Sequence, residues 1–335
     1  MYLSMKRPVA FLAIALATFL AACSQQPANN STTSVSGDNG ATPSLTPVTL
    51  MLNWYPEAEH GGYYAAMVHG YFEEQGLDVT IQPGRPNAPV IQQVARGEIE
   101  FGVINADRII LARAQDARLK GLFAPLANSP RCLLVHAESG IESFEQLKDV
   151  TLMMRRENAW AQFLINRLPL EGVDVVPNTS SLAPFLANKK AVKQGYIISE
   201  PFVAKSQGAD VRTLQVAELG FNPYTSVLMA RDELVTQQPQ LVQKMVAASL
   251  QGWQKYLGSP AETNQRIHEL NPEMDLEILD YGVQALKEHC VEHDSQNAIG
   301  AMTPDRWKTL VSQLEELEMI TLGSVDAAEL YLSSP

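Results

Sequence analysis

The sequence has 335 residues, of which 46% are hydrophobic and 19% charged, and its 25 basic and 37 acidic side chains give a formal charge of −12. Its length suits one large or two medium domains, and its composition excludes collagen-like, coiled-coil, disulfide-scaffold and wholly disordered chains. No stretch is rich in Lys and Arg. A nucleic-acid-binding surface is therefore not expected, because it needs clustered cations to neutralise phosphates.

The N-terminus has the pattern of a secretory signal peptide. Lys6 and Arg7 precede an apolar run at 9–22 that is interrupted only by Thr18. That run is shorter than the roughly 20 apolar residues that a membrane-spanning helix needs. It ends in Leu20-Ala21-Ala22-Cys23, which resembles the lipobox of bacterial lipoproteins, where the Cys is diacylated. The alternative is an ordinary secreted protein, cleaved near an Ala-x-Ala site, in which Cys23 is incidental.

The lipobox interpretation divides the N-terminal region into a signal peptide, 1–22, and a lipidated Cys with a flexible tether, 23–47. The tether is rich in Ser, Thr, Asn, Gly and Pro and has almost no large apolar residue. Such a segment buries too little surface to repay the cost of ordering it. A diacyl anchor supplies the two chains that stable membrane attachment needs. We therefore expect a protein of the cell envelope, held at a membrane and facing the periplasm or the cell exterior.

From Val48 onward, strand-like and helix-like stretches alternate, which is typical of α/β folds with helices packed on a mostly parallel sheet. Strands are expected at 48–52, 77–82, 101–105, 131–136, 150–154 and 194–199. Helices are expected at 63–75, 88–97, 107–117, 159–167, 240–257, 260–270, 276–289 and 304–317. Ligands of open α/β sheets bind beyond the carboxyl ends of the strands, so the loops there are where functional residues are expected.

The loop at 53–63 joins the first expected strand to a helix and carries three aromatic side chains, two carboxylates, an imidazole and a Gly pair. The motifs in and after it are Leu52-Asn53-Trp54-x-Pro56, His60-Gly61-x-Tyr63-x-Ala65, Gly70-Tyr71-Phe72, Glu200-Pro201-Phe202 and Gly220-Phe221-Asn222-Pro223-Tyr224. They resemble the thiamine-pyrimidine-precursor group of periplasmic substrate-binding proteins, which belongs with the alkanesulfonate, taurine and nitrate binding proteins of ABC importers. The resemblance extends from Val48 to about Leu322.

This resemblance implies a two-lobed α/β fold of the periplasmic-binding-protein type. Each lobe would be a mixed, mostly parallel sheet flanked by helices, with the ligand in a cleft between the lobes. The first lobe would comprise 48–131 and 226–335, and the second lobe 132–225. The two crossing segments are expected near residues 130–136 and 222–228.

The resemblance also implies a function. The chain is expected to be a lipid-anchored, monomeric substrate-binding protein that captures a small heterocyclic solute, similar to a pyrimidine precursor, for an ABC permease and its ATPase. It would use no cofactor, would not bind nucleic acid and would not be an enzyme. Two alternatives remain open: a receptor for a sulfonate, nitrate or other small anion, and an exported enzyme on the same scaffold.

The ligand-binding residues expected from the loops and the resemblance are Asn53, Trp54, His60, Tyr63, Asn105, Glu200 and Tyr224. Trp54 is the first candidate for stacking on a planar ligand, followed by Tyr63 and Tyr224; the alternative for Trp54 is a place in the core. His60 either donates to a carbonyl or anionic group of the ligand or caps the following helix.

Glu200 follows an apolar stretch that ends at Ile198, where a carboxylate can accept from an exocyclic amine and a ring N–H of an aminopyrimidine. The alternative is an N-cap before Pro201. Glu57 and Glu59 are expected to be solvated loop charges. Asn105 is expected to face the cleft, and Asp107 to cap the next helix.

Several positions depart from the relatives' pattern and leave the ligand's identity open: Asn105, Arg85 and the loop Arg155–Trp160, which could fill or reshape the pocket. His289-Cys290-Val291-Glu292-His293 has the spacing of inverted zinc-protease motifs, but it is read as a solvated helix end, and no metal site is expected. Cys132 and Cys290 are expected to be buried, unpaired thiols; the alternative is a disulfide between them, which an oxidising compartment would allow.

Overall fold

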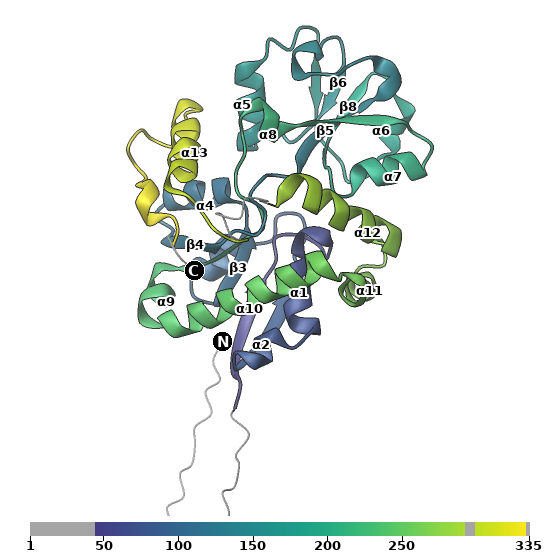
Figure 1. Ribbon diagram of the computed structural model, residues 1–335. Coiled ribbons are helices and arrows are strands. Elements are labelled where there is room, and N and C mark those ends of the chain that lie inside the picture. The colour runs from purple at the N-terminus through teal and green to yellow at the C-terminus, as the bar shows by residue number, and fades with distance from the viewer. Residues whose placement is uncertain (1–43, 292–298, 333–335) are drawn as a thin grey trace, which may run out of the picture. The chain divides into compact units, whose positions relative to one another are not determined.

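The computed structural model describes residues 44–291 and 299–332, in which two mixed five-stranded sheets are flanked by helices (Figure 1). This confirms the expected fold class. The predicted signal peptide, Cys23 and most of the predicted tether lie outside these ranges. Within the described ranges, no helix combines the length and the apolar character needed to cross a bilayer.

The first sheet has the strand order β2-β1-β3-β10-β4. Its strands are β1 (Thr46–Met51), β2 (Leu77–Gln82), β3 (Phe101–Ile104), β4 (Leu119–Phe123) and β10 (Val227–Arg231). β1 pairs in parallel with β2 and β3, whereas β10 runs antiparallel to its neighbours β3 and β4. The carboxyl ends of β1 and β3 therefore meet at one edge of this sheet.

The second sheet has the strand order β7-β6-β8-β5-β9. Its strands are β5 (Arg131–His136), β6 (Thr151–Met153), β7 (Asp174–Val176), β8 (Ala191–Tyr196) and β9 (Val211–Gln215). β5 is antiparallel to β8 and β9, and the register pairs Arg131 with Tyr196. The chain thus leaves the first sheet after β4, builds the second sheet, and returns at β10.

The helices of the first part of the chain and of the long C-terminal part are α1 (Gly61–Val68), α2 (Tyr71–Glu74), α3 (Val90–Ala95), α4 (Ala106–Arg113), α9 (Asp232–Gln237), α10 (Pro239–Gly258), α11 (Ala261–Leu270), α12 (Leu276–Ala285) and α13 (Pro304–Glu316). Those between β5 and β10 are α5 (Ala159–Arg167), α6 (Ala183–Ala187), α7 (Glu200–Ser206) and α8 (Val216–Leu219).

Two expected helices are interrupted. The helix expected at 63–75 is divided into α1 and α2 at Gly70, whose φ of 76° is left-handed and cannot continue an α-helix. The helix expected at 276–289 is α12 followed by a π-helical turn, Leu286–Cys290. The strand expected at 194–199 lies three residues earlier, as β8. The strands β4, β7, β9 and β10 were not among the expected elements.

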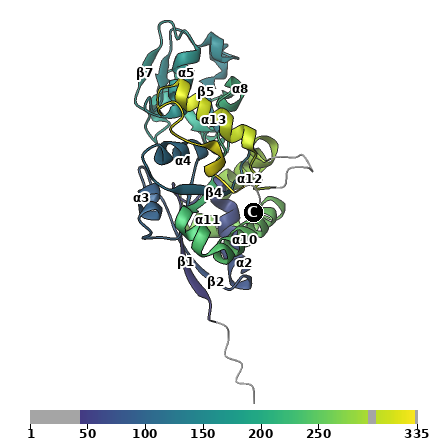
Figure 2. The same cartoon turned by 90° about the vertical axis from the view of Figure 1, so that its left-hand side faces the viewer.

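Helices cover both faces of the first sheet. Val48 and Leu50 of β1 join the apolar cluster that contains Trp253 of α10, whereas Met51 joins the opposite cluster with Val90 and Ile110. Figure 2 shows α3 and α4 on one side of β1 and β2, with α2 and α10 on the other. This alternation follows from the period of two along a strand.

Helix α1 lies directly against α10 because both carry glycine at the contact. A Cβ atom at Gly62 would lie 2.1 Å from the Trp253 ring, and one at Gly252 would lie 2.2 Å from the Gly62 carbonyl oxygen. No other residue allows this approach without displacing a neighbour. The close contact fixes α1 and, with it, the loop that precedes α1.

The two connections between the sheets are bonded to each other. The Thr225 N–H donates to the Leu126 carbonyl at 3.0 Å, in an isolated antiparallel bridge. The Ser129 N–H donates to Asn222 Oδ1 at 2.8 Å. Arg306 of α13 donates to the carbonyls of Asn222 and Ala127, and so holds both connections at once. The expected lobe boundaries near these connections remain a prediction.

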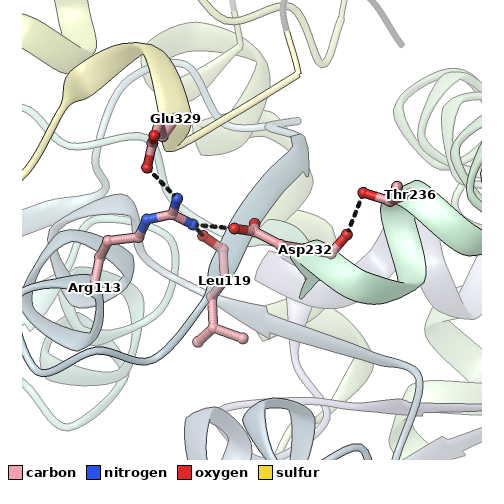
Figure 3. A network of polar contacts seen from close by, with 5 residues as sticks. All are labelled: Arg113, Leu119, Asp232, Thr236 and Glu329. Carbon is pink, nitrogen blue, oxygen red and sulfur yellow. Dashed lines mark hydrogen bonds and ion pairs between the residues drawn. The ribbon is translucent and has the colours of Figure 1, made fainter.

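A second arginine ties the C-terminal segment to the first sheet (Figure 3). The Arg113 side chain, 8% exposed, donates to Asp232 Oδ2 at 2.7 Å and to Glu329 Oε2 at 2.5 Å. It also donates to the Leu119 carbonyl at 3.1 Å. Asp232 begins α9 just after β10, so one guanidinium joins α4, β4, α9 and the C-terminal turn.

Candidate functional site

The loop that follows β1 is held by the neighbouring loop that follows β2. The Gly84 N–H donates to the Trp54 carbonyl at 2.8 Å. A Cβ atom at Gly84 would lie 2.3 Å from the Leu52 carbonyl oxygen, so only glycine allows the two backbones to meet here. Residues 58–60 then form a short 3₁₀ turn that leads into α1.

Glu57 and Glu59 in this loop are buried, and the expectation that they are solvated is wrong. Their exposed fractions are 6% and 1%. The reason is tertiary: α12 lies over this loop, and a Cβ atom at Gly282 would meet both the Ala58 side chain and the Ile198 carbonyl. Burial raises the pKa of Glu57 well above its usual value, the charges of Glu59 and Glu200 raise it further, and Arg131 opposes them.

His60 is fully buried next to these acids. Its Nε2 lies 2.9 Å from Asn53 Oδ1 and 3.1 Å from Glu59 Oε1, which suits a proton on Nε2. His60 occupies the N-cap position of α1, yet its side chain makes no capping bond. The helix-cap alternative therefore does not describe this side chain. Its Nδ1 and the second oxygen of Glu59 are buried without a hydrogen-bond partner.

The end of β3 contributes two further polar side chains. Asn105 Nδ2 donates to the Tyr196 hydroxyl at 3.4 Å, a contact between the ends of β3 and β8, and its Oδ1 is buried without a partner. Asp107, 7% exposed, also has an unpartnered oxygen, Oδ1. Burial raises the pKa of Asp107, and the charges of Arg108 and Arg131 oppose the shift. Asn105 and Asp107 thus lie where the first sheet meets the second.

Glu200 is the first residue of α7, and Ser199 is its N-cap. Glu200 Oε2 accepts from the Tyr196 N–H at 2.9 Å and from the Ser199 hydroxyl at 2.7 Å. The capping position is therefore taken by Ser199, and Glu200 turns back toward the end of β8. Its charge acts on Glu57 of the first loop.

Sequence reasoning missed Arg131 and Tyr196, and it considered Trp160 only as part of the loop at 155–160 that could fill or reshape the pocket. Arg131 lies above the Tyr196 ring at 4.1 Å and near the Trp160 ring at 5.5 Å. Trp160 is 6% exposed, and its Nε1 has no partner. The one available signal was the position of Arg131, a cation at the start of a strand just after the first connection between the sheets.

The three predicted aromatic ligand contacts lie in different surroundings. Trp54 is half-buried and edge-on to Tyr55, at 5.4 Å between ring centroids. Tyr63 is fully buried, with its ring on Trp253. Tyr224 is 4% exposed, with Arg306 over its ring. The structure therefore brings Asn105 and Glu200 into contact with Tyr196, and Asn53 into contact with His60. It surrounds Tyr63 and Tyr224 with protein. Their roles as ligand contacts remain predictions.

A cavity of about 530 Å³ lies elsewhere, between α12 and β9, lined among others by Val211, Arg212, Tyr281 and His289. None of its lining side chains has a buried polar atom without a partner. Among residues 44–291 and 299–332, no cluster of three or more His, Cys, Asp or Glu side chains is placed to hold a metal ion, and His293 lies outside these ranges. The unpartnered polar atoms of Glu59, His60, Asn105 and Asp107 thus belong to residues that do not line this cavity.

Comparison with known proteins identifies a matching family model and several relatives. The family model described as NMT1/THI5 like matches residues 57–263. The riboflavin-binding protein RibY of Chloroflexus aurantiacus is 26% identical over 258 residues, 74% of this chain and 73% of that protein. The formylaminopyrimidine-binding protein of Halalkalibacterium halodurans is 26% identical over 312 residues, 89% of this chain and 90% of that protein.

An enzyme is also among the relatives. The 4-amino-5-hydroxymethyl-2-methylpyrimidine phosphate synthase of Legionella pneumophila is 22% identical over 248 residues, 68% of this chain and 74% of that protein. Among solved structures, the periplasmic aliphatic sulphonate binding protein SsuA from Escherichia coli superposes with a TM-score of 0.67 at 13% identity, covering 87% of this chain and 94% of SsuA. This likeness shows the periplasmic-binding-protein fold.

Proposed function

Because this chain belongs to the NMT1/THI5-like family, we propose that it is a lipid-anchored substrate-binding protein that captures a small heterocyclic solute outside the cytoplasm. The solute would be similar to a pyrimidine precursor of thiamine. The receptor would work as a monomer and deliver the solute to the permease and ATPase subunits of an ABC importer. Two relatives, whose matches cover 74% and 89% of this chain, are named as binding proteins for heterocycles, which supports this proposal.

One observation carries the proposal: among the described residues, four of the twelve buried side-chain polar atoms without partners lie in the loop after β1 and at the start of α4. They are Glu59 Oε2, His60 Nδ1, Asn105 Oδ1 and Asp107 Oδ1. Each buried polar atom without a partner costs about 1–3 kcal/mol, so a group of them on adjacent loops is costly in the ligand-free protein. A ligand that hydrogen-bonds to them would recover this energy on binding.

The chemistry of the cluster favours a ligand with N–H donors. Three of the four unpartnered atoms are oxygens of carboxylate or amide groups, which accept hydrogen bonds. An aminopyrimidine offers such donors from its exocyclic amine. A small anion would instead lie beside Glu57, Glu59 and Asp107, all of them buried. This arrangement weighs against the sulfonate and nitrate alternatives, because an anion offers only acceptors and the unpartnered oxygens of Glu59, Asn105 and Asp107 are acceptors too.

Binding without turnover tests the proposal. Purified protein would be titrated calorimetrically with formylaminopyrimidine, 4-amino-5-hydroxymethyl-2-methylpyrimidine, riboflavin, an alkanesulfonate and nitrate, and the bound molecule recovered for mass spectrometry. We expect one heterocycle to bind in a 1:1 complex and to be recovered unchanged. A chemically altered product would favour the exported-enzyme alternative, and binding of the anions alone would favour the anion-receptor alternative.

A matched pair of variants locates the binding site. Asp107→Asn is expected to weaken heterocycle binding by about tenfold, since an amide accepts an N–H less strongly than a carboxylate. Asp78→Asn, at an exposed position on β2, is the control and should bind as the unmodified protein does. Equal affinities for both variants would contradict the placement of the site between the sheets.

The anchor is tested separately. Membrane fractionation of cells that produce the full chain should find the protein with the membrane, and Cys23→Ala should release it. A radiolabelled fatty acid should be incorporated into the unmodified chain and not into Cys23→Ala. Release of neither form, or labelling of both, would contradict lipidation at Cys23.

A further inference from the structure

Arg131 is held between the two sheets by aromatic rings. It is the first residue of β5, and the antiparallel register places it opposite Tyr196, whose ring lies 4.1 Å from the guanidinium carbon. The Trp160 ring of α5 lies 5.5 Å from the same carbon. Contact with the faces of aromatic rings attracts a guanidinium without using its N–H groups in hydrogen bonds.

Those N–H groups have no protein acceptor within the described ranges. The contacts recorded for the Arg131 side chain are the two rings, whereas Arg113 and Arg306 donate to carboxylate or carbonyl oxygens. Arg131 is only half-buried, but Trp160 beside it is 6% exposed and carries an indole N–H without a partner. Arg131 of β5 and Trp160 of α5 therefore both carry donors without a protein acceptor in the part of the chain that the structure describes.

Two unpartnered acceptors lie at the start of α4, which follows β3 of the first sheet. Asn105 Oδ1 and Asp107 Oδ1 are buried without partners, and Asn105 is bonded to the same Tyr196 that lies under Arg131. Arg131 also acts electrostatically on Asp107 and on Glu57. The candidate site thus combines donors of Arg131 and Trp160 with acceptors of Asn105 and Asp107.

We propose that Arg131 is a specificity-determining residue whose guanidinium donates hydrogen bonds to a carbonyl oxygen of the ligand. The ligand is therefore a planar heterocycle with both a carbonyl group and an N–H group. The carbonyl faces Arg131 and Trp160, and the N–H faces Asp107 and Asn105. This inference rests on the proposed function and refines it. Amides, ureides and imides attached to or part of a ring have this pattern, and an aminopyrimidine without a carbonyl does not.

The test compares binding of heterocycles that carry a carbonyl group with binding of one that lacks it. Formylaminopyrimidine and riboflavin carry carbonyl groups, and 4-amino-5-hydroxymethyl-2-methylpyrimidine carries none. Calorimetry on the unmodified full-length protein should show at least tenfold tighter binding of a carbonyl-bearing probe. Arg131→Met should weaken that probe by about 10- to 100-fold, the effect of losing hydrogen bonds to a charged group. Its effect on the hydroxymethyl probe should be less than threefold.

Two further variants make the result specific. Arg131→Lys keeps the charge but loses the two-pronged donor geometry, so it should lose part of the carbonyl preference. It also serves if Arg131→Met does not fold, as judged by circular dichroism. Arg96→Met removes an arginine whose side chain is 59% exposed and should leave all affinities unchanged.

The outcomes distinguish failure of the role proposed for Arg131 from failure of the proposed function. If heterocycles with and without a carbonyl group bind equally well, the proposed role of Arg131 is overturned and the proposed function stands. A carbonyl preference that survives in both Arg131 variants does the same. If none of the heterocycles binds the unmodified protein, the proposed function and the role of Arg131 are both overturned.

Discussion

The Tyr63 hydroxyl donates to the backbone carbonyl of Ser226 at 2.7 Å, across 163 positions of sequence. Ser226 in turn donates from its own hydroxyl to the Glu59 carbonyl at 2.6 Å. Ser226 has a φ of 57°, a left-handed conformation unusual for a residue with a side chain. These bonds join the loop of the candidate site and α1 to the connection that returns to the first sheet at β10.

Removal of the Tyr63 hydroxyl should therefore destabilise the fold. Tyr63→Phe leaves the buried Ser226 carbonyl without its partner, and we expect the free energy of unfolding to fall by about 1–3 kcal/mol. Urea denaturation followed by circular dichroism measures this change. Tyr71→Phe is the control, because Tyr71 is half-buried and its hydroxyl has no recorded partner in the described part of the chain. Equal losses in the two variants would show that the bond to Ser226 is unimportant.

Glu57 should make stability depend on pH. Burial raises its pKa in the folded protein well above the unfolded value of about 4.3, with Glu59 and Glu200 adding to the shift. A carboxyl with a raised folded pKa contributes stability below the unfolded pKa, and this contribution is lost as the pH rises toward the folded pKa. Glu57→Gln does not ionise, so it should raise the melting temperature at pH 7 and change it little at pH 4.

Thermal unfolding between pH 4 and pH 8 measures this effect. The control is Glu73→Gln, at an exposed position of α2, whose melting temperature should follow that of the unmodified protein across the range. A difference between Glu57→Gln and the unmodified protein that is the same at pH 4 and pH 7 would contradict a raised pKa as its cause.

Arg113 should matter more for stability than a surface cation. Arg113→Met leaves Asp232 and the Leu119 carbonyl without their donor, and we expect a loss of about 2–3 kcal/mol in the free energy of unfolding. Lys189→Met removes one partner of an ion pair with Glu138 in which both side chains are more than half exposed, and such pairs contribute about 0–1 kcal/mol. Chemical denaturation of both variants gives the comparison. A larger loss in Lys189→Met would refute the role given to Arg113.

The two body cysteines should resist alkylation in the native protein. Both are free and buried, as the sequence predicts. Burial raises the pKa of Cys132 well above its usual value and that of Cys290 to about 12. The reactive thiolate is therefore rare at pH 8. In Cys23→Ala, intact-mass analysis after iodoacetamide treatment should find no label on the native chain and two labels after denaturation. Rapid labelling of the native chain would contradict this expectation.

Several elements could be predicted to the residue because their signals are local. The alternating run of β2 at Leu77–Gln82, the strand β5 at Arg131–His136 and the helix α5 at Ala159–Arg167 have the predicted bounds. Apolar periodicity and flanking residues determine such segments without reference to distant parts of the chain. The loop after β1 could also be predicted as a candidate binding loop, because its aromatic and polar side chains follow a strand end; its role stays a prediction.

What the tertiary structure decided is the environment of those side chains. The sequence predicts solvated charges at Glu57 and Glu59. In the structure α12, more than 200 positions later, covers their loop and buries them. In the sequence Arg131 is an ordinary cation. The antiparallel register of β5 and β8 places its guanidinium over the Tyr196 ring. Sequence patterns report whether a residue belongs to a strand, helix or loop. Burial and pairing depend on which distant segments fold against the residue, and this buried two loop acids and placed one strand-end arginine over a tyrosine ring in the candidate binding site.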